Sequence, residues 1–191
     1  MKQGKDSLGL LEYEKAISIN DIAAKELTGE VASMYYKAKK FDKAIEFFTK
    51  RSKLVSLNSA EEYEFGKALY SGPKDYVLAD SAFARVNKLA PTYAQGYFWR
   101  ARCYYKIDPN NEKWSAQPHC EKVIELIKPE DRATNNNKPM ILEVSKYLAD
   151  YYAKSPAKDE AKSIFYYEII YQLDPNNATA KQVLKAVGKI K

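Results

Sequence analysis

The sequence has few of the residues on which catalysis, metal binding or covalent cross-linking usually depends. Among 191 residues there are two cysteines, Cys103 and Cys120, and a single histidine, His119. Two cysteines are too few for a disulfide framework, and we expect unpaired thiols ahead of a single bridge. Neighbouring residues on a helix point about 100° apart, so His119 and Cys120 are poorly placed to share a metal ion. Since no nucleophile motif surrounds the histidine, we predict no enzyme activity, no metal and no cofactor.

Long apolar runs, glycine-rich loops and alternating segments are also missing. No stretch is apolar for long enough to span a bilayer, and the first residues lack the apolar core of a signal peptide. Gly4 and Gly9 precede helical sequence without the rest of a phosphate-binding loop. No useful length alternates with period two, which excludes a sheet. Hydrophobic residues make up 46%, as in globular proteins. The formal charge of +6 is compatible with an acidic partner but does not by itself indicate nucleic acid.

What the sequence does contain is a repeat. Three small residues are separated by 34 and then 35 residues, and three aromatic residues by 35 each: Ala32, Gly66 and Ala101, and Tyr13, Phe48 and Phe83. This period is typical of a helix–turn–helix unit that cannot bury its apolar face alone, so that neighbouring units must stack. We therefore predict an all-α solenoid of antiparallel helix pairs with about ten helices.

Local signals mark the ends of several predicted helices. We interpret Ser59-Ala60-Glu61-Glu62 as a capping box, in which the Ser59 oxygen accepts from the helix and Glu62 reaches back. The next small residue after Ala101 is Ala149, 48 positions on, so the register breaks once. A loop at 108–113 and a long exposed connection at 129–139, which is rich in asparagine and proline, together account for this excess at little entropic cost.

These residues resemble tetratricopeptide (TPR) repeats. The first complete unit carries Val31, Ala32, Tyr35, Phe41, Ala44 and Phe48 in the pattern of that family. The resemblance implies a right-handed solenoid and covers nearly all of residues 1–191. We assign repeats to 25–58, 59–91, 94–128 and 142–175, the second helix of a truncated unit to 6–20, and a C-terminal capping helix to 177–190. The half unit at 6–20 predicts that the chain is the C-terminal part of a longer protein, cut within an array.

The amino-acid pattern of the repeats, above all from Ala94 to Arg102, is similar to that of envelope-associated TPR proteins from Bacteroidetes-type bacteria. This likeness implies the cell envelope or periplasm, with the cytoplasm left open as an alternative. In TPR arrays the first helices of successive units line a concave groove, and the same faces here define a candidate partner surface. We call it the groove set: Tyr36, Lys37, Tyr63, Lys67, Tyr70, Phe98, Arg102, Tyr105 and Lys106.

The groove set predicts a protein-interaction scaffold that binds a peptide or helix carrying carboxylates, since tyrosine and arginine dominate binding hot spots. The competing interpretation is that tyrosine, present 16 times, lines the surface without binding anything. The family's clamp for a C-terminal carboxylate is not expected here, because Gly29 and Ser33 occupy its positions. A nucleic-acid or anionic-polymer binder ranks second, since no base-reading pair recurs from unit to unit. A third alternative is a module that only positions another domain.

Overall fold

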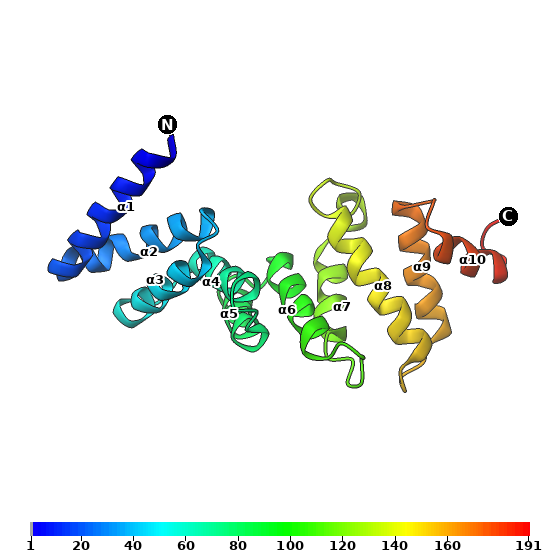
Figure 1. The fold of residues 1–191 in the computed structure, drawn as a ribbon. Coiled ribbons are helices and arrows are strands. Elements are labelled where there is room, and N and C mark those ends of the chain that lie inside the picture. The colour runs from blue at the N-terminus through cyan, green and yellow to red at the C-terminus, as the bar shows by residue number, and fades with distance from the viewer. Residues whose placement is uncertain (1) are drawn as a thin grey trace. The chain divides into compact units, whose positions relative to one another are not determined.

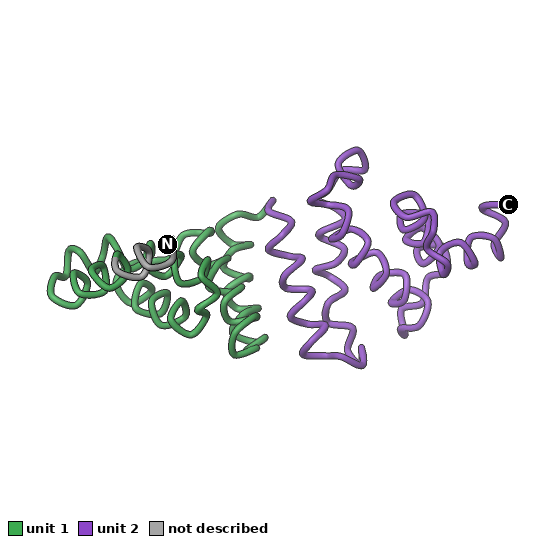
Figure 2. The backbone as a smooth tube through the Cα atoms, turned by 45° about the horizontal axis from the view of Figure 1, so that its top comes forward, with its two compact units in different colours: residues 1–91 green, residues 92–191 purple. Residues whose placement is uncertain are grey.

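The structure, a computed structural model, describes residues 2–191, with side chains from residue 9 onward. This part of the chain contains ten α-helices, one short 3-10 turn and no strand (Figure 1). The all-helical prediction is therefore confirmed. The contacts divide the chain into two compact units, unit 1 at residues 1–91 and unit 2 at residues 92–191 (Figure 2). The assignment of four repeats stays a prediction.

Unit 1 is a series of helices in which each packs against the next along the chain. Its elements are α1 (Lys2–Ile19), α2 (Asp21–Lys37), α3 (Phe41–Leu54), α4 (Ser59–Ser71) and α5 (Tyr76–Leu89). Short turns make α2 and α3, and likewise α4 and α5, antiparallel neighbours. Helix α2 also contacts α4, so the two first helices of the predicted repeats lie side by side. The segment expected at 6–20 is α1; the side chains of its first residues, 6–8, lie outside the described part.

Unit 2 follows the same plan with longer connections. It contains α6 (Ala94–Ile107), α7 (Gln117–Leu126), a 3-10 turn η1 (Pro129–Asp131), α8 (Lys138–Lys154), α9 (Glu160–Leu173) and α10 (Ala178–Ala186). Helix α6 contacts α8 as well as α7, which again places two first helices side by side. The predicted capping helix at 177–190 is shorter in the structure, because Asn177 acts as its N-cap and the helix ends before Val187.

The small residues that defined the repeat lie where helices cross closely. Ala32, Ala101 and Ala149 are fully buried, and Gly66 is buried beneath the ring of Phe83. A Cβ atom added to Gly66 would lie 2.9 Å from that ring, which is closer than a side chain tolerates. These positions therefore need small residues because of packing, as the repeat predicts.

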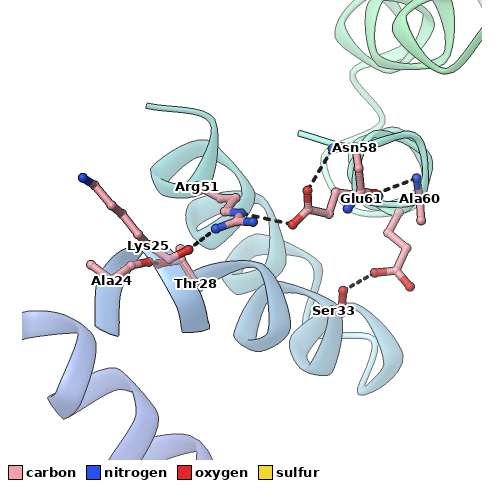
Figure 3. Close-up of polar contacts among 9 residues, drawn as sticks. Ala24, Lys25, Thr28, Ser33, Arg51, Asn58, Ala60 and Glu61 are labelled. Atoms are coloured by element: carbon pink, nitrogen blue, oxygen red, sulfur yellow. Dashed lines mark hydrogen bonds and ion pairs between the residues drawn. The ribbon is translucent and has the colours of Figure 1, made fainter. Parts of the chain in front are cut away.

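The start of α4 differs from the sequence interpretation by one residue (Figure 3). The N-cap is Asn58, whose side chain accepts from the backbone N–H groups of Ala60 and Glu61, and Glu61 reaches back to the Asn58 N–H at 2.9 Å. The predicted box beginning at Ser59 is thus wrong. Glu62, expected to reach back, is instead buried and pairs with Arg85 of α5 at 2.6 Å.

Glu61 also joins the two helix pairs of unit 1. Arg51 of α3 donates through Nε to Glu61 at 3.1 Å, and its Nη1 donates to the carbonyl oxygen of Lys25 in α2 (Figure 3). Gly29 makes room for this contact, because a Cβ atom there would meet the Glu61 carboxylate. Arg51 is therefore a structural tether between the two helix pairs.

Candidate functional site

The groove residues of unit 1 lie on the adjacent first helices α2 and α4. Tyr36 and Lys37 are in the last turn of α2, and Tyr63, Lys67 and Tyr70 follow one face of α4. A hydrogen bond donated by the Ser33 hydroxyl to Glu64 links the two helices directly. The structure therefore brings these five residues onto neighbouring elements of one unit, as the sequence predicts for this half of the set.

Each tyrosine of this group packs against an aromatic ring of the second helix in its pair, α3 or α5. Tyr36 contacts Phe41 at 6.3 Å between ring centroids, and Tyr63 meets Phe83 edge-on at 5.8 Å. Tyr70 meets Tyr76 edge-on at 5.1 Å. All three tyrosines are partly exposed, and the ring contact helps to hold each of them in place. Rigid aromatic surfaces of this kind lose little entropy on binding.

The charge on the unit 1 face is mixed. Lys37 is exposed and Lys67 is half-buried, as expected for a basic surface. Glu64 was missed by the sequence analysis, yet it accepts from Ser33 on the same face. Burial, and then the charge of Glu64, raises the pKa of Tyr36, so its hydroxyl remains a hydrogen-bond donor at neutral pH.

In unit 2 the predicted residues Phe98 and Arg102 form one stack on α6. The guanidinium of Arg102 lies 4.8 Å from the Trp99 ring centroid and 5.5 Å from that of Phe98. Its Nε pairs with Glu143 of α8 at 3.1 Å. Stacking and pairing together fix the orientation of Arg102. They also offset its charge, so unit 2 is less basic here than the sequence alone suggests.

Tyr105 and Lys106 have different surroundings although they are adjacent. Lys106 is exposed, as predicted for a partner contact. The Tyr105 hydroxyl instead lies 3.1 Å from the Sγ of Cys120, and its ring contacts Tyr147 at 5.0 Å. Burial raises the pKa of Tyr105 far above its usual value. The polar end of Tyr105 is thus engaged with Cys120 of α7, while its side chain stays partly exposed.

The sequence analysis missed an aromatic cluster next to Tyr105. Trp114 packs edge-on against Tyr147 at 5.6 Å and Tyr151 at 5.5 Å, and all three side chains are partly exposed. Tyr147 and Tyr151 lie one turn apart on α8, whereas Trp114 comes from the connection between α6 and α7. We call Trp114, Tyr147 and Tyr151 the unit 2 cluster. The four-residue spacing on α8 was a readable signal, but nothing local indicated that Trp114 folds back onto it.

Asp108 holds the connection that carries Trp114. Its carboxylate accepts from the backbone N–H groups of Glu112 at 2.8 Å and Lys113 at 3.0 Å. Desolvation raises the pKa of Asp108, but hydrogen bonds from the backbone of residues 112–115 outweigh it and lower the pKa below its usual value. Asn111 and Trp114 adopt left-handed backbone angles, with φ of 55° and 53°. The loop is therefore an organised support for the partly exposed indole ring of Trp114.

The described residues contain no group of three or more His, Cys, Asp or Glu side chains that could hold a metal ion. His119 stacks on Tyr104 at 5.3 Å between centroids. Cys103 and Cys120 are free thiols and fully buried, and burial raises the pKa of Cys120 to about 12. A protonated, inaccessible thiol is a poor nucleophile. Within residues 2–191, no helix has the length and apolar character needed to cross a membrane.

Comparison with known proteins places this arrangement in a family. No family model and no curated protein matches the sequence. Among solved structures, the C-terminal part of a TPR repeat-containing protein from Cytophaga hutchinsonii is 32% identical, with a TM-score of 0.76, over 95% of this chain and 68% of that one. YrrB and MamA share the fold at 16% and 17% identity, each with a TM-score of 0.65. They are matched over 86% and 94% of their own chains, and over 96% and 93% of this one.

The chain therefore belongs to the TPR-repeat family. The resemblance inferred from the repeated small and aromatic residues is confirmed, as is the α-solenoid class. The relative from Cytophaga hutchinsonii also agrees with the bacterial likeness seen in the repeats. At a general level, these relatives support a protein–protein interaction scaffold as the class of function.

Proposed function

We propose that the chain is a non-catalytic scaffold that binds a peptide or helix of a partner protein on the first-helix faces of its units. The observation that carries the proposal is the set of partly exposed aromatic side chains on adjacent first helices and on the connection that packs against α8. In unit 2 these are the unit 2 cluster and Phe98; in unit 1 they are Tyr36, Tyr63 and Tyr70. Rigid tyrosine and tryptophan surfaces are the commonest anchors in protein interfaces.

The geometry in unit 2 gives this proposal its detail. Trp114 contributes an indole ring and Tyr151 a phenol ring to one surface, and Asp108 fixes the loop behind the indole. Lys106 adds an exposed cation at the end of α6. Such a surface suits apolar side chains of a peptide, with carboxylates meeting Lys106. The ring of Tyr105 packs against that of Tyr147, and Tyr105 is not one of the proposed contacts with the partner.

The charge pattern refines the proposed partner. Arg102 and Lys154 are offset by Glu143 and Asp150, at 3.1 and 2.8 Å. These pairs lower the positive charge that α6 and α8 offer to a partner, which favours a peptide of mixed character over a highly charged polymer. The solved relative YrrB is described as a TPR protein with an unusual peptide-binding site, which supports a peptide as the ligand class.

The proposal can be tested by selecting peptides from a random library on the intact chain. We expect the selected peptides to lose most of their affinity for the double variant Trp114→Ala, Tyr151→Ala, while Lys181→Glu on α10 binds as the parent does. Helical melting of each variant must be compared with that of the parent. Peptides that bind the double variant equally well would remove the unit 2 cluster from the proposal. Binding of a polyanion that weakens steeply with salt would favour the nucleic-acid alternative.

A further inference from the structure

Unit 1 contains a hollow on a different side of α4 from the groove set. It has a volume of about 560 Å³ and lies where the end of α3, the start of α4 and the end of α5 meet. On α4 it is lined by Glu62 and Phe65, which precede Tyr63 and Lys67 by one and two residues. At about 100° per residue, they point about 100° and 160° away from those groove residues. The hollow is therefore separate from the proposed partner surface.

Two cations border this hollow, and one is held in a fixed orientation. Arg85 of α5 donates through Nε to Glu62 at 2.6 Å, while about half of its side chain remains exposed. This contact uses only Nε and leaves the two terminal nitrogens of the guanidinium for a second partner. Lys88, one turn along α5, is exposed on the same wall. A guanidinium fork beside an ammonium group is suited to a carboxylate.

The remaining walls of the hollow are formed by apolar side chains and by the carboxylate of Glu62. Leu57 and Phe65 give a largely buried apolar surface, and Leu89 is 54% exposed beside it. Glu62 is 5% exposed, and its Oε2 atom has no hydrogen-bond partner. Oε2 itself has almost no accessible surface, so a ligand N–H group would meet the rest of the Glu62 carboxylate where it lines the hollow.

From these three features we infer that the hollow binds the C-terminal residue of a peptide chain with a large apolar side chain. A C-terminal residue carries a carboxylate, an N–H group and a side chain close together, and each complements one feature of the hollow. Its carboxylate meets Arg85 and Lys88, its N–H donates toward Glu62, and its side chain covers Phe65 and Leu89. A hollow of about 560 Å³ is also within the range that holds a small ligand.

The experiment titrates the full chain with N-acetyl-leucine and follows backbone amides by NMR. We expect saturable shifts confined to residues 52–65 and 85–89, and much smaller ones with N-acetyl-leucinamide, which lacks the carboxylate, or N-acetyl-glycine, which lacks the apolar side chain. Lys88→Glu should weaken binding by about tenfold or more, since it replaces a charge-assisted contact with a repulsion. Lys181→Glu, the same charge change at an exposed site of unit 2, should leave it unchanged.

A second arm uses an unstructured peptide ending in leucine with a free or an amidated C-terminus. Binding of the free form alone supports a chain end as the occupant. Binding of N-acetyl-leucine but of neither peptide would overturn that assignment. Equal binding of N-acetyl-leucine and its amide, or parent-like binding by both Lys88→Glu and Arg85→Gln, would overturn the inference as a whole. Melting curves show whether Arg85→Gln, which leaves Glu62 unpaired, remains folded.

Discussion

Units 1 and 2 bury similar ladders of small residues but stabilise their helices by different means. In unit 1 the two helix pairs each close through a short turn, at residues 38–40 and 72–75, and polar contacts of Arg51 and Glu61 join one pair to the other. In unit 2 the connections at 108–116 and 127–137 are long, and single side chains organise them. The comparison teaches that one repeat pattern tolerates both solutions, because the pattern specifies the helix crossings and leaves the connections free.

The long connections of unit 2 are not loosely attached. Asp108 gathers the backbone N–H groups of the first connection, and Arg132 serves the second. The Arg132 guanidinium donates to the carbonyl oxygens of Ile127 and Ile124, both at 3.2 Å. Ile124 lies in the last turn of α7 and Ile127 is its C-cap residue, and carbonyl groups at these positions lack partners within the helix. Arg132 therefore caps a helix from a loop, which a short turn could not do.

The largest expected effect concerns the helix crossings. Gly66→Ala should lower the free energy of unfolding by about 2 kcal/mol, because the new Cβ meets the fully buried Phe83 ring. Gly9→Ala in α1 is the matched control in the same unit, since an added Cβ there meets nothing within 4 Å. We expect this control to stay within about 1 kcal/mol of the parent, because alanine is also the better helix former. Equal losses in chemical denaturation would show that the two glycines have the same role.

The cap provided by Arg132 should have the next largest effect. Arg132→Met removes both hydrogen bonds to α7 while keeping an apolar stem, and we expect a loss of about 1.5 kcal/mol in the free energy of unfolding. Amide hydrogen exchange should also rise in the last turn of α7. Lys128→Met, at an exposed neighbouring position, is the control and should change neither quantity. Unchanged exchange in α7 would contradict the capping role.

The Asp108 loop predicts a dependence on pH. Because the folded-state pKa of Asp108 is lowered, its stabilising contribution is complete above the unfolded-state pKa and is lost as the pH falls through the folded value. Acidification from neutral pH to about pH 3 should therefore destabilise the parent more than Asp108→Asn. The measurement is denaturation at both pH values, with the fluorescence of Trp114 followed in a Trp99→Phe background. Lys113→Met, at an exposed position in the same loop, is the control and should lose as much stability on acidification as the parent does.

The smallest effect is expected for an exposed ion pair. Lys154 and Asp150 lie 2.8 Å apart on α8, with 65% and 47% of their side chains exposed. Lys154→Ala should change the free energy of unfolding by less than about 0.5 kcal/mol, because solvent screens the pair. Arg102→Ala, which also loses contacts with Trp99 and Glu143, should cost more in the same thermal and chemical denaturation experiments. The reverse order would show that ring stacking contributes little in unit 2.

The sequence allowed the helices and their crossings to be predicted because both depend on local periodicity. Ala32, Gly66, Ala101 and Ala149 were identified from spacing, and all four are buried. Helix ends were less predictable where the signals were degenerate. Asn58 and Ser59 are both good N-caps, and each is followed three residues later by a glutamate, so the sequence offered two equivalent boxes. The choice between them depends on Arg51 and Arg85, which reach Glu61 and Glu62 from other helices.

The candidate site was predictable only in part for the same reason. Helical spacing correctly placed Tyr36, Tyr63 and Tyr70 on adjacent first helices, with one side of each partly exposed. It could not show that α7 covers the Tyr105 hydroxyl, nor that Trp114 returns to α8 across a nine-residue connection. Glu143, which offsets Arg102, also lies on a different helix. Whether the groove set binds a partner stays a prediction.

The sequence by itself determined the all-helical class, the family and the positions at which helices must approach closely, because each follows from periodic spacing along the chain. Tertiary structure alone decided which glutamate caps α4, which cations remain available to a partner, and how Trp114 joins the unit 2 cluster. Those outcomes depend on contacts between helices that are distant in sequence, and their energies arise only when the helices pack together.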